Sequence, residues 1–128
     1  MKAKILIVDD DPDIGRLITA VIESFGHEAT FLENAREALL KIVAESFDVV
    51  ITDRFMPDMD GIEFTRSIRK TKPSLTIIGM SGDDNENIFI NAGADSFIPK
   101  PLDFKILKNK INDHFKTLRS SNDHGIKV

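Results

Sequence analysis

Hydrophobic and polar positions divide the chain into two kinds of alternating segment. Short apolar runs rich in β-branched residues indicate buried strands, and longer segments with apolar residues three and four positions apart indicate helices. Five segments of each kind follow one another along the 128 residues. Each link between strands is long enough to hold a crossover helix. The pattern therefore predicts an α/β fold built on a parallel, doubly wound sheet.

The predicted strands differ in how apolar they are, and this difference orders the sheet. The runs at 4–8, 49–53 and 75–80 are the most apolar and are expected at the centre. The run at 27–31 is more polar and is expected at an edge, and the run at 96–98 is brief. Of the two common doubly wound arrangements, these features favour the five-stranded, flavodoxin-like order 2-1-3-4-5 with five helices.

Residues that cap helix N-termini precede the helical segments. Asp11 followed by Pro12 suits an N-cap with proline at the first helical position. Asp103 is expected to cap the last helix, whose apolar stripe runs from Phe104 to Leu118. Three further pairs, each separated by three positions, match the capping-box pattern. These pairs are Asn34 with Glu37, Asp60 with Glu63, and Asp83 with Glu86.

The length predicts one domain, because 128 residues suffice for one core and not for two. We expect this domain to span residues 1–118. Residues 119–128 (RSSNDHGIKV) are polar and without apolar periodicity, so we expect a flexible tail that is too short for a DNA-binding domain. Two alternatives stay open: a protein that stands alone, or the corresponding part of a longer one.

Composition excludes several classes of function. The net charge of −4 argues against direct nucleic-acid binding, and the lack of cysteine excludes disulfides, thiolate zinc sites and cysteine nucleophiles. No apolar stretch reaches membrane-spanning length, so we expect no membrane insertion and a cytoplasmic location. His27, His114 and His124 show no metal-ligand spacing and are interpreted as surface or structural residues.

Polar residues stand at the carboxyl ends of four predicted strands. Asp9 and Asp10 follow the first strand, Asp53 ends the third, Ser81 the fourth, and Lys100 follows the fifth. The carboxyl ends of parallel strands share one edge of the sheet, and neighbouring strands lie about 4.8 Å apart. We therefore expect three carboxylates, a hydroxyl and an ammonium group to form one site.

Three carboxylates beside one lysine require further positive charge. Two like charges about 4 Å apart repel by about 4 kcal/mol at an effective dielectric constant near 20. Either a carboxyl group takes up a proton or a cation binds, and hard oxygen ligands suit Mg²⁺ or Mn²⁺. Lys100 and Ser81 would then face phosphoryl oxygens. This arrangement predicts phosphoryl transfer onto a carboxylate nucleophile, for which Asp53 is the best candidate.

Four segments in this order resemble the receiver domain of bacterial two-component response regulators. They are ILIVDDDPDI, DVVITDRFMPDMDG, IIGMSGDD and GADSFIPKP, and the resemblance covers residues 3–118 or nearly so. The likeness is to the single-domain, chemotaxis-regulator type. It implies that Asp53 receives a phosphoryl group from a histidine kinase or a histidine phosphotransfer protein.

The resemblance also implies a ligand set for magnesium. Asp10, Asp53 and the backbone carbonyl of Phe55 would bind the ion directly, and Asp9 would act through water. Ser81 and Lys100 would contact the phosphoryl group.

Further roles follow from the same resemblance. Ser81 and Phe97 would form the switch, although Phe97 lacks the hydroxyl of the tyrosine that relatives often carry there. The bond between Lys100 and Pro101 would be cis. Phe55 and Asp83 would tune the lifetime of the acyl phosphate, with Phe55 shielding it from water.

The leading hypothesis is a phosphorylation-controlled switch. The surface of the fourth helix, fifth strand and fifth helix would change, and a downstream protein or a second copy would bind it. The chain would catalyse only its own phosphorylation and dephosphorylation. One alternative is a Mg²⁺-dependent phosphohydrolase acting through an aspartyl phosphate, disfavoured because Phe55 stands where a second acid is needed. Another is a receiver-like scaffold that never turns over phosphate.

Overall fold

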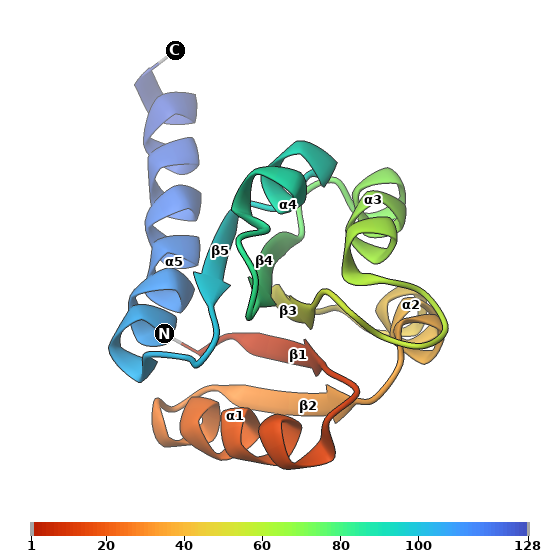
Figure 1. The fold of residues 1–128 in the computed structure, drawn as a ribbon. Helices are drawn as coiled ribbons and strands as arrows, with labels where there is room; N and C mark the ends of the chain where they lie inside the picture. The colour runs from red at the N-terminus through yellow and green to blue at the C-terminus, as the bar shows by residue number, and fades with distance from the viewer. Residues whose placement is uncertain (1, 128) are drawn as a thin grey trace.

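The computed structural model describes the backbone of residues 2–127 and the side chains of residues 2–116, and its core is a five-stranded parallel sheet (Figure 1). The strand order is β2-β1-β3-β4-β5, which confirms the predicted fold class. The strands are β1 (Lys4–Val8), β2 (Glu28–Leu32), β3 (Val49–Asp53), β4 (Thr76–Ser81) and β5 (Ser96–Pro99). The helices are α1 (Pro12–Ser24), α2 (Ala35–Ala44), α3 (Gly61–Thr71), α4 (Glu86–Ala92) and α5 (Phe104–Lys127).

Helices cover both faces of the sheet, as Figure 1 shows, and each face has its own apolar core. On one face, Ile5 and Ile7 of β1 pack with residues of α1 and α5. On the other face, Leu6 and Val8 pack with residues of α2, α3 and α4. Successive residues of a strand point to opposite faces, so a central strand covered on both sides must be apolar throughout. This explains the unbroken apolar run in β1.

Most predicted helix caps are present. Asp11 accepts hydrogen bonds from the backbone of the first turn of α1, and Asp60 does so for α3. Asn34 caps α2 by accepting from the backbone N–H of Glu37 at 2.9 Å. Asp103 accepts from the backbone N–H of Lys105 at 2.8 Å, at the start of α5. These side chains satisfy backbone donors that no helical carbonyl can reach.

The predicted capping box of Asp83 and Glu86 is wrong. Helix α4 begins at Glu86, and its N-cap position is occupied by Asn85, whose side chain makes no capping hydrogen bond. The physical reason is that the amide of Asn85 is already bonded to the side chains of Ser81 and Arg54.

Element boundaries differ elsewhere from those predicted. Strand β2 lies one residue later than expected, and β5 extends by one residue to Pro99. The backbone of α5 is helical to Lys127, beyond the expected end of the last helix at Leu118. The side chains of residues 117–128 lie outside the described part, so the domain boundary at 118 stays a prediction. No helix in the described part of the chain is long and apolar enough to span a bilayer.

Two histidines contribute to the core of the fold. The Nδ1 atom of His27 accepts from the backbone N–H of Ala3 at 3.0 Å, and burial lowers the pKa of His27. The Nδ1 atom of His114 lies 2.7 Å from the hydroxyl of Thr76. Both side chains are buried, so of the two interpretations, surface or structural, the structural one holds for these two residues.

Candidate functional site

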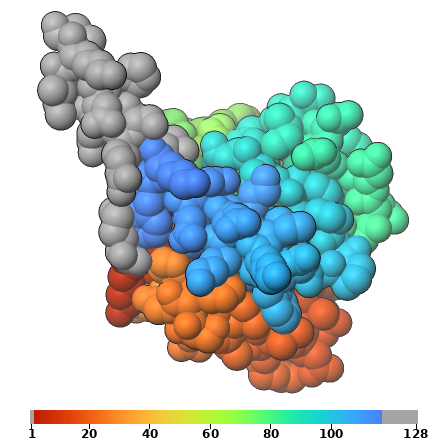
Figure 2. Space-filling view, turned by 90° about the vertical axis from the view of Figure 1, so that its left-hand side faces the viewer, coloured from red at the N-terminus to blue at the C-terminus, as the bar shows by residue number. Residues whose placement is uncertain are grey.

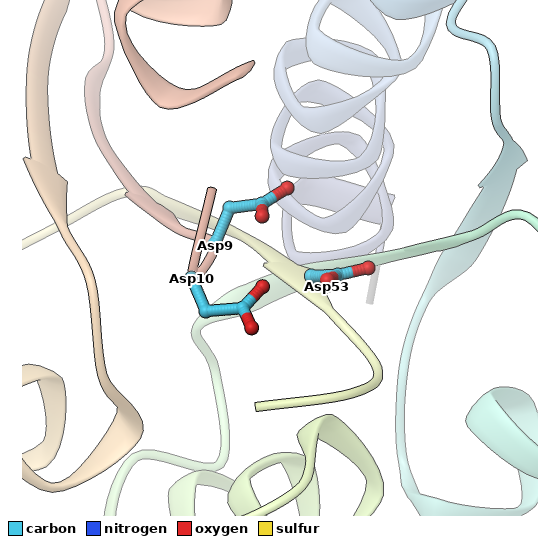
Figure 3. A group of neighbouring side chains, drawn as sticks. All are labelled: Asp9, Asp10 and Asp53. Atoms are coloured by element: carbon cyan, nitrogen blue, oxygen red, sulfur yellow. The ribbon is translucent and has the colours of Figure 1, made fainter. Parts of the chain in front are cut away.

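The ends of β1 and β3 bring three carboxylates together. The strands pair in register with Val8 opposite Thr52, so the following residues, Asp9 and Asp53, emerge side by side at the same edge. Figure 3 shows the side chains of Asp9 and Asp10 extending toward Asp53, and each of the three carboxylates offers an oxygen within 4.8 Å of the others. The predicted acidic cluster is therefore present.

The side chain of Lys100, which follows β5, reaches this cluster. Its Nζ lies 2.8 Å from Oδ2 of Asp9 and 3.1 Å from Oδ1 of Asp53. Its backbone N–H donates to the carbonyl of Ser81 at 2.8 Å, which ties the end of β5 to the end of β4. The peptide bond between Lys100 and Pro101 is cis. All five residues that the sequence places at this edge therefore come from strand ends that adjoin in space.

The three carboxylates differ in exposure. Asp9 is fully buried, and its other oxygen accepts from the backbone N–H of Asp11 at 2.9 Å. Asp53 keeps only 8% of its surface, whereas Asp10 is exposed. The cluster is thus closed beneath by Asp9 and open to solvent at Asp10.

The pKa values of Asp53 and Lys100 both rise, for different reasons. Burial raises the pKa of Asp53, and the negative charge of Asp9 raises it further, while Lys100 acts in the opposite direction. Burial alone would lower the pKa of Lys100, but its hydrogen bond to Asp9 and the charges of Asp9 and Asp53 outweigh burial and raise it. Lys100 therefore stays charged, and ionisation of Asp53 is less favourable than it would be in water.

The donor set fits a hard divalent cation. Three carboxylates stand against one ammonium group, so the cluster keeps a net negative charge when every acid is ionised. Carboxylate oxygens with an open, solvent-facing side are the ligands that Mg²⁺ prefers, because this ion keeps several of its waters. The cluster could hold such an ion through Asp10 and Asp53 without displacing Lys100 from Asp9.

The Ser81 hydroxyl lies at the end of β4, one strand away from Asp53. It accepts from the side-chain amide of Asn85 at 2.7 Å and from the backbone N–H of Asp83 at 3.1 Å. The carbonyl oxygen of Asn85 in turn accepts from Nη1 of Arg54, the residue after Asp53. The sequence did not single out Asn85 or Arg54, since a lone Asn before a helix indicates only a cap.

Phe55 and Phe97, to which the family resemblance gives roles, lie in opposite environments. Phe55 is exposed over 55% of its surface, and the guanidinium of Arg54 lies 4.8 Å from the centre of its ring. Phe97 is buried and packs against Phe89, with ring centres 5.8 Å apart. Phe97 thus belongs to the core beneath α4 in this structure, whereas Phe55 is exposed to solvent two residues after Asp53 in the chain.

Glycine makes the close approach of α3 to Asp53 feasible. The backbone N–H of Gly61 donates to the carbonyl of Arg54 at 2.6 Å. A Cβ at position 61 would lie 2.1 Å from the backbone oxygen of Asp53, well inside contact distance. The Asp60–Gly61 pair therefore begins α3, and the lack of a side chain at Gly61 allows α3 to pack directly against the backbone of Asp53.

Known proteins with similar sequences identify the family of this chain. Residues 5–112 match the family described as the response regulator receiver domain. The response regulator MprA of Mycolicibacterium vanbaalenii is 34% identical over 105 residues, which cover 80% of this chain and 46% of that protein. An uncharacterised 14.6 kDa protein of Leptolyngbya boryana is 31% identical, with 77% of this chain and 79% of that protein covered. This chain spans about half, or less, of the length of several of the curated relatives that it matches.

Solved structures agree with the sequence matches. The Francisella response regulator 1452 receiver domain superposes with a TM-score of 0.85 at 29% identity, covering 91% of this chain and 98% of that one. The chemotaxis response regulator CheY4 of Vibrio cholerae gives a TM-score of 0.82 at 27% identity, covering 89% and 99%. The chain therefore belongs to the receiver domain family of two-component response regulators, whose members are phosphorylation-controlled signalling switches.

Proposed function

We propose that Asp53 is the phosphoryl acceptor of this receiver domain and that a histidine kinase or a histidine phosphotransfer protein supplies the group. The observation that carries the proposal is the position of Lys100, whose ammonium group contacts Asp53 inside a cluster of three carboxylates. An ammonium at that place neutralises the carboxylate now and can bind a phosphoryl oxygen afterwards.

The proposed transfer is a displacement at phosphorus. One carboxylate oxygen of Asp53 forms the new O–P bond while the P–N bond to the donor histidine breaks, and the imidazole keeps the electron pair of that bond. Lys100 stays anchored to Asp9 and turns its remaining donors to the phosphoryl oxygens. The hydrolysis that later regenerates Asp53 is proposed to use the same residues, so the chain acts only on itself.

Magnesium fits the same site and is generally required by receiver domains. We assign Asp10, Asp53 and the carbonyl of Phe55 as its direct ligands and Asp9 as a ligand through water, with Mn²⁺ as a substitute. When bound, the ion supplies positive charge that offsets the carboxylates and the phosphoryl oxygens. Asp10 suits direct binding because its carboxylate faces solvent, and Asp9 suits an indirect role because Lys100 already holds it.

The proposed output is a change in the surface of α4, β5 and α5. Figure 2 shows segments from α4 and α5 exposed on one face of the molecule. Ser81 would bind the phosphoryl group, and Phe97 would change its packing against Phe89 as Ser81 moves. A downstream protein or a second copy of the chain would then bind this face. Phe55 and Asp83 are proposed to tune how long the phosphoryl group persists.

The alternative of a phosphohydrolase is not supported. The family match is to signalling switches, and Phe55 occupies the position, two residues after Asp53, at which a second acid would be needed. The scaffold alternative predicts that no phosphoryl group is accepted, so a test of phosphorylation separates it from the switch. The cytoplasmic location stays a prediction.

Intact mass after incubation with acetyl phosphate and Mg²⁺ tests the proposal. Wild type is expected to gain about 80 Da, the mass of one phosphoryl group, and Asp53→Asn is expected to gain nothing. The exposed Asp84→Asn serves as a matched control and should behave like wild type. An unmodified wild-type protein, or an adduct that persists in Asp53→Asn, would disprove the assignment.

A further inference from the structure

The hydroxyl of Ser81 is hydrogen-bonded to the segment between β4 and α4. Asn85 and the backbone of Asp83 both donate to it, at 2.7 and 3.1 Å. Ser81 and Asn85 are 2% and 4% exposed, so water has little access to the bond between their side chains. Within the described residues, none of the hydrogen bonds of the Ser81 hydroxyl reaches Asp53. The hydroxyl accepts both bonds and keeps its own proton to donate. We expect it to turn away from Asn85 when it donates that proton to a group on Asp53.

Asn85 is placed to cap α4 and does not do so. An N-cap residue normally has an extended backbone and accepts from the second or third N–H of the helix. Asn85 has φ −114° and ψ 14°, and its side chain makes no capping bond. Both ends of its amide are used elsewhere, since the nitrogen donates to Ser81 and the oxygen accepts from Arg54. These two partners also define which end of the amide is which.

Arg54 connects this contact to the acceptor residue, because it follows Asp53 directly in the chain. Its Nη1 donates to Asn85, and its guanidinium lies 4.8 Å from the centre of the Phe55 ring. Its Nε is buried and has no hydrogen-bond partner among the described residues. A buried donor without an acceptor is unfavourable. A phosphoryl oxygen on Asp53 would offer Arg54 an acceptor and so favour its movement away from Asn85.

We propose that Asn85, held in place by Arg54, is a positioning residue that keeps Ser81 in its resting orientation and so opposes activation. We name the hydrogen-bonded chain Ser81–Asn85–Arg54 the Ser81 latch. The inference rests on the proposed function, in which Ser81 moves to a phosphoryl group on Asp53. A contact made only in the resting state lowers the apparent affinity of any ligand that binds the active state. The latch thereby sets how much binding free energy a phosphoryl group must supply before the active state is populated.

Beryllofluoride with Mg²⁺, which stands in for a phosphoryl group on Asp53, measures this effect. The chain contains no Trp or Tyr, so binding is followed by backbone amide NMR shifts rather than by intrinsic fluorescence. Asn85→Ala is expected to bind about three- to tenfold more tightly than wild type, the range set by one net hydrogen bond. The exposed Asn87→Ala, on the same helix, should bind as wild type does. Equal or weaker binding by folded Asn85→Ala would overturn the proposal.

A double-mutant cycle separates the latch from a purely structural role. In a Ser81→Ala background, the hydroxyl that Asn85 holds is absent, so Asn85→Ala should no longer tighten binding. A gain that persists without the hydroxyl would show that Asn85 acts by another route and would overturn the latch. Should Asn85→Ala fail to fold, Arg54→Met provides the test, because it leaves Asn85 in place without its anchor. It should tighten binding about two- to fivefold, and unchanged affinity would contradict the proposal.

The wild-type titration distinguishes failure of the latch from failure of the proposed function. A wild-type protein that neither binds beryllofluoride nor accepts a phosphoryl group would overturn both. A wild-type protein that does both, with Asn85→Ala unchanged, would overturn the latch alone.

Discussion

The ammonium of Lys100 lies 2.8 Å from Oδ2 of Asp9, although 91 positions separate these residues in the chain. Asp9 is fully buried, and Lys100 is the cation that neutralises it in this structure. A buried carboxylate that loses its cation keeps the cost of desolvation without its compensation. The contact between them therefore supports the fold as well as the site.

Replacing Lys100 by methionine tests this double role. We expect Lys100→Met to lower the free energy of unfolding by about 2–3 kcal/mol at pH 7, because the charge of Asp9 is left buried and unpaired. Urea unfolding measures the loss. Lys105→Met is the control, since Lys105 is exposed at the start of α5, and it should change stability by less than about 0.5 kcal/mol. Similar losses in both variants would contradict the role given to Lys100.

Magnesium should stabilise the protein through the acidic cluster. A ligand that binds only the folded state at about 100 times its Kd raises the free energy of unfolding by about 2.7 kcal/mol. We therefore expect the Tm of wild type to rise with MgCl₂ and that of Asp10→Asn to rise much less. Asp13→Asn, an exposed acid in α1, should respond as wild type does. An undiminished response in Asp10→Asn would remove Asp10 from the ligand set.

The raised pKa of Asp53 makes its contribution to stability depend on pH. The folded state binds the proton more tightly than the unfolded state, so ionisation of Asp53 destabilises the fold. This cost is absent below the ordinary pKa of 3.8 and complete above the raised value. Asp53→Asn should therefore gain stability relative to wild type as pH rises from about 4 to about 7.

Urea midpoints across that pH range, without divalent ions, check the Asp53 prediction. Asp84→Asn is the matched control because Asp84 is exposed. A difference between Asp53→Asn and wild type that stays constant with pH would show that Asp53 titrates alike in the folded and unfolded chains.

Phe55 is expected to slow the loss of the phosphoryl group. The guanidinium of Arg54 lies 4.8 Å from the centre of its ring, two residues after Asp53, and we propose that the ring limits the approach of water to Asp53. Phe55→Asn should dephosphorylate faster, by up to about tenfold, which corresponds to about 1.4 kcal/mol of barrier. The decay of the phosphorylated mass measures the rate, with Phe104→Asn, at an exposed phenylalanine of α5, as the control. An equal or slower rate in Phe55→Asn would refute the shielding role.

Gly61 should not tolerate a side chain. A Cβ there would lie 2.1 Å from the carbonyl oxygen of Asp53, and backbone cannot rotate away as a side chain can. We expect Gly61→Ala to cost about 1–3 kcal/mol of unfolding free energy and to impair phosphorylation by displacing Asp53. Gly82→Ala is the control, because a methyl group at position 82 would meet no atom within 4 Å beyond its chain neighbours. Equal stability of the two variants would exclude the collision.

The sequence by itself determined the sheet and the location of the site. Strand β1 is apolar without a break from Ile5 to Val8, which suits a strand covered on both faces, and it has the bounds that the pattern predicts. Since parallel strands end at one edge, Asp9, Asp53 and Lys100 had to meet there. The apolar periodicity that predicts a strand or a helix lies within a short stretch of the chain, so the sequence alone contains it.

Only the tertiary structure decided what Asn85 does. The pattern favoured a capping box of Asp83 and Glu86, and the fold instead turned the Asn85 amide to Ser81 and to Arg54, 31 positions away in the chain. A helix cap and a single buried hydrogen bond each contribute about 1 kcal/mol. When local and distant partners are so evenly matched, the residues that the fold brings alongside decide between them.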